Sequence, residues 1–239
     1  MATSHTVKAY DAELTELDRL TAQIGGIAEK QLADAFDALQ RRDPKLAESV
    51  IDSDRALDQL DRQVQERAIQ MIALRQPMAN DLRHVMTVLK VAGDLERIGD
   101  LAKNIAKRAL AVAGEAHPQP LMNGLKHMTE LAQRQLKDVL DAFGTRDVAK
   151  ADMVWHSDAR LDALYNSVFR ELLTYMMEDP RNIGLCTHLL FGAKNIERIG
   201  DHTTNIAENV HYLVVGVMPD DNRPKGDDTS SVLVSRPTP

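Results

Sequence analysis

Several residue types are scarce in this chain of 239 residues, and each scarcity removes a class of protein. A single cysteine, Cys186, excludes an internal disulfide and suits a reducing compartment. Basic residues number 29 against 36 acidic ones, so the chain lacks the positive stripe that a nucleic-acid backbone requires. No run of about 18 apolar residues occurs, and the N-terminus shows no signal-peptide pattern. We therefore expect a cytoplasmic protein without a transmembrane segment and without a nucleic-acid partner.

Aromatic residues make up only 4% of the chain, whereas hydrophobic residues make up 44%. Alanine, leucine and charged residues dominate, a composition that favours helix over strand. Apolar residues recur at helical spacing, and no segment alternates with a period of two. The sequence predicts an all-α protein built as a tandem pair of antiparallel three-helix bundles.

The expected helices are bounded by turn signals. In the first bundle, residues 8–112, helices are expected over about 8–41, from the Asp43-Pro44 cap to Arg75, and over about 79–112. Residues 113–120 form a linker, and the second bundle spans 121–216. The polar segment 217–239, rich in proline, aspartate and serine, is expected to be a disordered tail.

An internal repeat covers most of the chain. Residues 94–107, DLERIGDLAKNIAK, match residues 195–208, NIERIGDHTTNIAE, at eight of fourteen positions. Residues 31–58 match residues 135–162 at an offset of 104, and the offset falls to 101 in the later block. The chain is therefore a tandem duplication whose second copy is three residues shorter.

Acidic residues at i,i+4 spacing recur in both copies of the repeat. Such pairs lie on one helix face, and each costs a helix about 0.2–0.5 kcal/mol, so their recurrence calls for a compensating cation. The first copy holds Asp54 with Asp58 and Glu96 with Asp100, and the second holds Asp158 with Asp162 and Glu197 with Asp201.

The turn positions predict that these pairs converge. Asp54 and Asp100 each lie 23 residues from Pro77, which marks the turn between their helices. Asp158 and Asp201 are likewise equidistant from the midpoint between Asp179 and Pro180. Since residues equidistant from a hairpin turn face each other, we expect one cluster of four carboxylates in each half.

Three interpretations of the clusters remain open from the residues alone. They can bind Mg, Mn or Fe through oxygen ligands. Arg97, Arg198 and nearby lysines can neutralise them in a solvated ion-pair network, or the carboxylates can line an exposed polar surface. A carboxylate-metal enzyme, an oxidase or a hydrolase, is the alternative function. Ferritin-type oxidases use a glutamate followed by a histidine three residues later, and neither Glu96 nor Glu197 has a histidine at that position.

Other residues near the motif have two interpretations each. Gly99 and Gly200 lie inside helices, where close helix approach or a ligand can explain them. Asn104 and Asn205 can supply carbonyl ligands or hydrogen-bond the backbone. His202 can join a metal shell, although a packing role fits its helix position better.

With its duplicated ERIGD-x-x-x-NIA blocks and paired acids, the chain over residues 8–216 resembles the PhoU family. The resemblance implies a non-enzymatic, cytoplasmic negative regulator of the phosphate-starvation response. Its implied partners are the ATPase subunit of the phosphate ABC transporter, a membrane sensor histidine kinase and a second copy of the chain as a homodimer. It also implies metal ions (Fe, Zn, Mn or Mg) at the eight acids Asp54, Asp58, Glu96, Asp100, Asp158, Asp162, Glu197 and Asp201.

Overall fold

The computed structural model describes residues 2–219 of the chain, and within them every regular element is a helix. The prediction of an all-α fold is confirmed. The last twenty residues of the predicted tail lie outside the described part. In order, the elements are α1 (Ala2–Arg41), α2 (Pro44–Arg75), α3 (Asn80–Val112), α4 (Gln119–Thr145), α5 (Val148–Glu178), the short 3₁₀ helix η1 (Pro180–Asn182) and α6 (Ile183–Val215).

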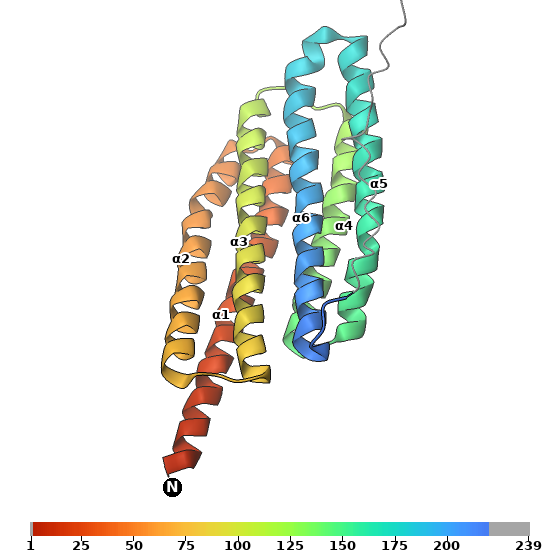
Figure 1. Ribbon diagram of the computed structural model, residues 1–239. Coiled ribbons are helices and arrows are strands. Elements are labelled where there is room, and N and C mark those ends of the chain that lie inside the picture. Colours follow the sequence, from red (N-terminus) through yellow and green to blue (C-terminus); the bar gives the residue numbers. More distant parts are fainter. Residues whose placement is uncertain (1, 220–239) are drawn as a thin grey trace, which may run out of the picture.

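Helix α1 starts earlier than the apolar pattern indicated. It begins at Ala2 instead of near residue 8, because the preceding residues contain no proline or glycine that would stop a helix. Its N-terminal end projects beyond the rest of the molecule (Figure 1).

The same turn ends the first helix of each half. Arg42 and Arg146 both adopt left-handed backbone conformations with φ of 55°. Asp43 then caps α2 by accepting hydrogen bonds from the backbone N–H groups of Lys45 and Leu46, and Asp147 caps α5 in the same way. The local sequence therefore forms the junction between the first and second helices in the same way in both copies.

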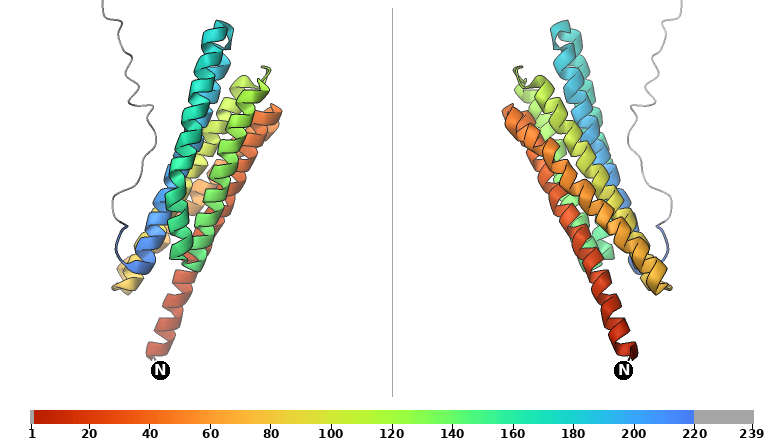
Figure 2. Two further views of the ribbon diagram at one scale, coloured as in Figure 1. Left: turned by 90° about the vertical axis from the view of Figure 1, so that its right-hand side faces the viewer. Right: turned by 90° about the vertical axis from the view of Figure 1, so that its left-hand side faces the viewer.

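The two three-helix units lie side by side and form one continuous body. Helices α1–α3 form one unit and α4–α6 the other, with α3 and α6 antiparallel neighbours at the centre (Figure 1). The turn between α2 and α3 lies at one end of the molecule, and the turn between α5 and α6 lies at the opposite end (Figure 1). In side view, the long helices run lengthwise along an elongated molecule (Figure 2).

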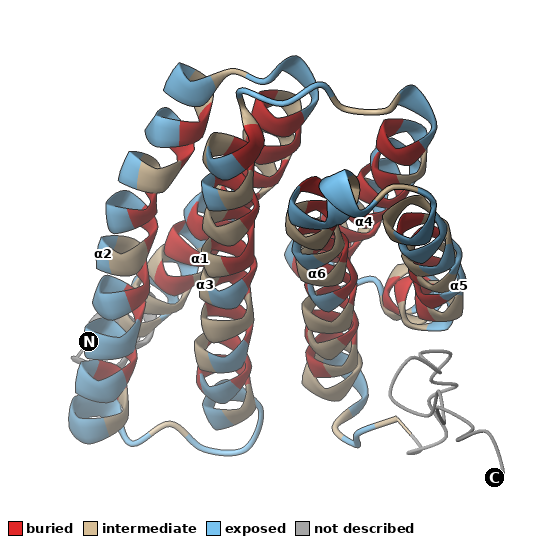
Figure 3. Ribbon diagram, turned by 90° about the horizontal axis from the view of Figure 1, so that it is seen from above, coloured by how far each residue is buried: buried red, intermediate tan, exposed pale blue. Residues whose placement is uncertain are grey.

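Buried residues face the interior of each unit and the seam between α3 and α6 (Figure 3). The core consists mainly of leucine, isoleucine, valine and alanine, with Leu17, Leu57, Ile98 and Leu161 fully buried. Small and aliphatic side chains allow the helices to approach closely, so the low aromatic content is no obstacle to a large core. This frame fixes the helix faces on which the acids lie.

Candidate functional site

The first acid cluster spans α2 and α3. The Lys103 ammonium of α3 donates hydrogen bonds to Asp54 of α2 at 2.5 Å and to Asp100 of α3 at 2.6 Å. Asp54 is buried, and Asp100 is half-buried. The two acids that are equidistant from Pro77 therefore face each other, and a lysine lies between them.

Glu96 and Asp58 occupy the next layer of the same cluster. Burial raises the pKa of Glu96 above its ordinary value, and the negative charge of Asp100 raises it further. Asp58 contributes a smaller increase in the same direction, while the guanidinium of Arg97 opposes them. The four acids predicted for the first half thus share one electrostatic environment.

A fifth acid, Asp61, belongs to this cluster and was missed in the sequence. It lies on the same face of α2 as Asp54 and Asp58, is 9% exposed, and accepts a hydrogen bond from Gln65 at 2.6 Å. Burial raises the pKa of Asp61 above its ordinary value, and the charge of Asp58 adds to this. The repeat concealed it, because the equivalent residue in the second copy is Tyr165.

The second cluster is more deeply buried than the first. Asp158, Asp162 and Glu197 are each at most 5% exposed, and Asp201 is half-buried. Burial raises the pKa of Glu197 to about 7, against the opposing effect of a 2.9 Å hydrogen bond from Lys194. The charges of Asp201 and Asp162 also raise it, so the structure brings these predicted acids together.

The two motif glycines permit close contact between helices. A Cβ atom on Gly99 would lie 2.6 Å from Cδ1 of Leu57, and one on Gly200 would lie 2.4 Å from Cδ2 of Leu161. Buried glutamines bond across each unit beside them, Gln31 to Ser53 at 2.9 Å and Gln135 to Ser157 at 2.8 Å. Packing explains both glycines without a ligand.

His202 and Asn205 connect the two halves. Nδ1 of His202 lies 2.9 Å from Oδ1 of Asp94, on α3 of the other half, and Nδ2 of Asn205 donates to the same oxygen at 3.4 Å. The packing role favoured for His202 thus takes the form of a hydrogen bond across the seam.

Glu208 and His211, near the C-terminal end of α6, form a Glu-x-x-His pattern of the kind that ferritin-type oxidases use. Glu208 accepts a hydrogen bond from Trp155 at 3.1 Å, and His211 pairs with Asp152 at 3.0 Å. The pattern therefore serves contacts between α5 and α6.

The acid clusters fit a metal chemically but not as preassembled sites. Among residues 2–219, no three histidine, cysteine, aspartate or glutamate side chains converge in a geometry ready to hold an ion. Two buried carboxylate oxygens in this part of the chain nevertheless have no hydrogen-bond partner, Asp61 Oδ1 in the first cluster and Glu197 Oε2 in the second. Carboxylate oxygens are ligands that Mg, Mn and Fe accept, so the chemistry of each of these two atoms suits a cation.

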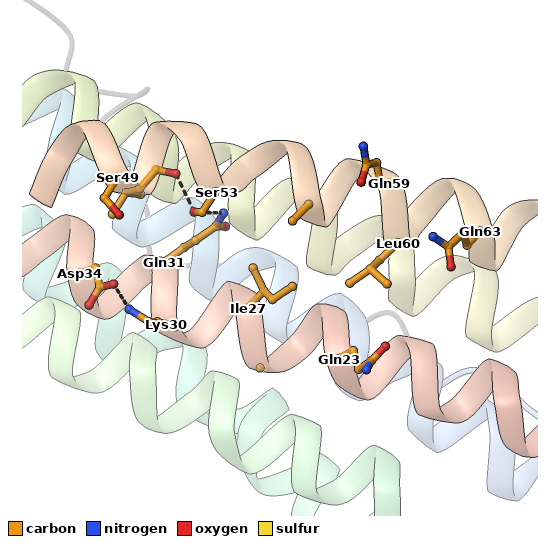
Figure 4. Close-up of a pocket in the computed structure, with 13 residues that line it drawn as sticks. Gln23, Ile27, Lys30, Gln31, Asp34, Ser49, Ser53, Gln59, Leu60 and Gln63 are labelled. Atoms are coloured by element: carbon orange, nitrogen blue, oxygen red, sulfur yellow. Dashed lines mark hydrogen bonds and ion pairs between the residues drawn. The ribbon is translucent and has the colours of Figure 1, made fainter.

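A groove of about 660 Å³ between α1 and α2 lies away from the acids (Figure 4). The Gln31–Ser53 hydrogen bond and the apolar side chains of Ile27 and Leu60 line it, and the Lys30–Asp34 ion pair lies at its edge (Figure 4). None of the eight predicted residues lines this groove.

Within residues 2–219, none of the helices is both long and apolar enough to cross a bilayer.

Comparison with known proteins gives concordant matches. The PhoU domain family model matches residues 21–109 and 125–210, one match in each half. The "Phosphate-specific transport system accessory protein PhoU homolog" of Rhizobium meliloti is 53% identical over 232 residues, covering 97% of this chain and 98% of that protein. The Escherichia coli K12 protein of the corresponding name is 38% identical and covers 97% of this chain and 95% of its own length.

Solved structures agree with the sequence matches. The crystal structure of PhoU from Pseudomonas aeruginosa is similar, with a TM-score of 0.85 and 38% identity over 87% of this chain and all of that one. The phosphate transport system regulatory protein PhoU from Streptococcus pneumoniae gives a TM-score of 0.81 and 29% identity over 88% of this chain and 99% of that one. With both halves matched and the relatives covered almost end to end, the chain belongs to the PhoU family, whose members are non-enzymatic regulatory proteins.

Proposed function

We propose that this protein is a cytoplasmic accessory regulator of phosphate transport that represses the phosphate-starvation response when phosphate is plentiful. The observation that carries the proposal is the similarity over nearly the whole chain to proteins named as phosphate-specific transport system accessory proteins. Regulation through protein contacts, rather than catalysis, fits a helical scaffold whose polar residues are distributed along helix faces.

The proposed partners are the ATPase subunit of the phosphate ABC transporter, a membrane sensor histidine kinase, and a second copy of the chain in a homodimer. Exposed apolar side chains at the two ends of the molecule support protein contacts. Leu74 and Met78 at the α2–α3 turn are 78% and 80% exposed, and Met177 near the α5–α6 turn is 77% exposed. Exposed methionines adapt to differently shaped partner surfaces.

The acid clusters are proposed to bind metal ions. Iron, zinc, manganese or magnesium would neutralise the carboxylates and cross-link the helices of each cluster. The first cluster would use Asp54, Asp58, Glu96 and Asp100, and the second would use Asp158, Asp162, Glu197 and Asp201. The unpartnered Glu197 Oε2 supports this proposal, because an unpaired buried carboxylate oxygen is costly.

A genetic experiment tests the regulatory role. Deleting the gene and measuring phosphatase expression in high phosphate should give constitutive expression. Complementation with the wild-type gene is the control, and expression that stays repressed in the deletion strain would contradict the proposal. Co-purification with the transporter ATPase subunit and with the kinase would test the partners, and light scattering at several concentrations would test the dimer.

Elemental analysis of protein purified without chelator tests the metal. The wild type should contain metal, and Asp100→Asn combined with Asp201→Asn should contain less. Bound metal should also raise the thermal midpoint, since a ligand that binds only the native state stabilises it. A protein that stays metal-free in saturating Mn²⁺ or Mg²⁺ would contradict the metal proposal and favour the interpretation in which basic side chains neutralise the acids.

A further inference from the structure

The groove between α1 and α2 is lined by side chains that together carry no net charge. Ile27 of α1 and Leu60 of α2 point toward each other across it (Figure 4). Of the described residues that line it, Lys30 and Asp34 are charged, and they form an ion pair with each other. Uncharged polar side chains supply much of the remaining lining: Gln23, Gln31, Ser49, Ser53, Gln59 and Gln63. The groove therefore suits an uncharged ligand that offers both apolar groups and amide groups.

Two small residues leave this groove open. Gly26 lines it from α1, and a Cβ atom on Gly26 would have no packed neighbour within 4 Å. Glycine inside a helix costs about 1 kcal/mol relative to alanine, and here no close helix contact requires it. Ala56 lines the groove from α2 and is exposed. Packing within the bundle therefore does not account for the open space.

The second half of the chain has large charged residues at the equivalent positions. At the offset of 104 residues, Glu130 corresponds to Gly26, and Arg160 corresponds to Ala56. The glutamine–serine hydrogen bond between the same two helices is nevertheless present in both halves. The small residues that open the groove thus belong to the first half alone, although the helices pair in the same way.

Residues 230–235, with the sequence SSVLVS, have the chemistry that this groove suits. They carry no charge, and Val232, Leu233 and Val234 are consecutive apolar residues in a stretch otherwise rich in charged residues, serine and proline. Glutamine and serine side chains can donate hydrogen bonds to backbone carbonyls and accept them from backbone N–H groups. An extended segment offers both kinds of group along its length, together with side chains that alternate between its two sides.

The described chain ends within reach of the groove. Met218 lines a different groove, between α2, α3 and α6, together with Gln65 of α2. Gln63 of the same helix lines the groove on the α1 side, and a helix with its side chains is about 10–12 Å across. Residues 219–229 separate Met218 from the uncharged segment, and a fully extended stretch of that length spans up to about 40 Å. This length is enough for the chain to pass around α2.

We propose that the groove between α1 and α2 binds residues 230–235 of the same chain as an extended, uncharged segment. Val232 and Val234, on one side of the segment, contact Ile27 and Leu60, and the glutamine side chains of the groove hydrogen-bond the backbone. The segment then covers this face of α1 and α2, so a partner that uses the face must first displace it. The inference involves none of the acid clusters and does not depend on metal binding.

Cysteine crosslinking in the full chain tests the contact. Gly26→Cys combined with Val232→Cys places one thiol in the groove and one on the segment. A short bismaleimide should join these thiols at least tenfold faster than those of the control pair, because binding raises their effective concentration. The control combines Val232→Cys with Glu130→Cys, at the equivalent position of the second half. The native Cys186 is fully buried and does not compete.

The rates separate the possible occupants of the groove. Equal rates for the two pairs would overturn the proposal and leave the groove to a segment of another protein. Mixing the Gly26→Cys protein with the Val232→Cys protein distinguishes a second copy, because it permits crosslinks only between chains. Crosslinking between chains as fast as within one chain would overturn binding within the same chain.

A second measurement leaves the segment itself unaltered. Ala56→Arg introduces the residue of the second half into the groove, at an exposed position where arginine is compatible with the helix. It should speed backbone hydrogen exchange of residues 231–235 at least tenfold, because the segment loses its binding surface. The control Ala73→Arg, at an exposed position of α2 that does not line the groove, should leave the exchange unchanged. Exchange that is equally fast in the wild type and in Ala56→Arg would overturn the proposal.

Discussion

The two halves of this molecule share their packing but differ in their charges. Each half ends its first helix at a left-handed arginine followed by a capping aspartate, bonds a buried glutamine to a serine, and sets a glycine against a leucine. In contrast, the lysines Lys103 and Lys194 have Thr204 and Gly93 at their equivalent positions. Contacts that hold helices together have no substitute nearby, whereas a cation can approach a carboxylate cluster from either end. The copies have therefore kept these packing contacts while placing their lysines at different positions.

The largest effect should come from the shared core. Leu57→Ala and Leu161→Ala each remove a fully buried side chain that lies against a motif glycine, so each should lower the free energy of unfolding by about 2–5 kcal/mol. Denaturant titration followed by circular dichroism measures this loss. The control Leu74→Ala, at a side chain that is 78% exposed, should change stability by less than about 0.5 kcal/mol. A large effect in one half alone would break the equivalence of the two cores.

The pH dependence of stability should distinguish the clusters next. The pKa of Glu197 is raised from 4.5 to about 7, so the native state holds the proton more tightly than the unfolded chain. The contribution of Glu197 to stability is then fully present below about pH 4.5 and is lost as the pH rises through about 7. In protein stripped of metal, Glu197→Gln should remove this loss and stabilise the protein by about 2–3 kcal/mol at pH 8, measured by denaturant titration across pH.

Glu96→Gln provides the matched comparison in the first half. The pKa of Glu96 is raised in the same direction, but its side chain is 22% exposed against 5% for Glu197. Solvent lessens the cost of the Glu96 charge, so Glu96→Gln should raise the free energy of unfolding at high pH by less than Glu197→Gln does. An equal gain in both variants would show that burial does not set the difference between the clusters.

The motif glycines should give an effect of about 1–3 kcal/mol. Gly200→Ala places a methyl group 2.4 Å from Leu161 in a closely packed interior, so unfolding should become easier by that amount. Gly93→Ala is the control within the same fold, since its Cβ meets nothing, and it should stabilise helix α3 by about 1 kcal/mol. Thermal midpoints of the two variants should therefore move in opposite directions, and a shift in the same direction would contradict the packing explanation.

The features that the sequence predicted correctly, the helix ends and the register of the facing acids, depend on local signals in the chain. Asp43, Asp147 and the prolines at the turns set helix ends, and the distances of Asp54 and Asp100 from Pro77 set the register of the facing acids. Asp61 was not predicted, because its equivalent in the second copy is Tyr165 and only acids present in both copies were taken as ligands, although its spacing from Asp54 and Asp58 puts it on their helix face. The approach of α3 to α6 could not be predicted, since contacts between distant helices leave no periodic trace in either one.

That seam between α3 and α6 yields the smallest and most specific prediction. His202 pairs with Asp94 across the halves at 2.9 Å, and neither residue is repeated, since Leu101 and Asn195 are their equivalents. Exchanging one residue for its equivalent, as in His202→Leu or Asp94→Asn, should lower the free energy of unfolding by about 0.5–1 kcal/mol, because both side chains are partly solvated. The double variant should lose less than the sum of the single losses, since the pair is already broken by either change. Strict additivity of the two losses in a double-mutant cycle would show that the halves are held together at this point by apolar packing alone.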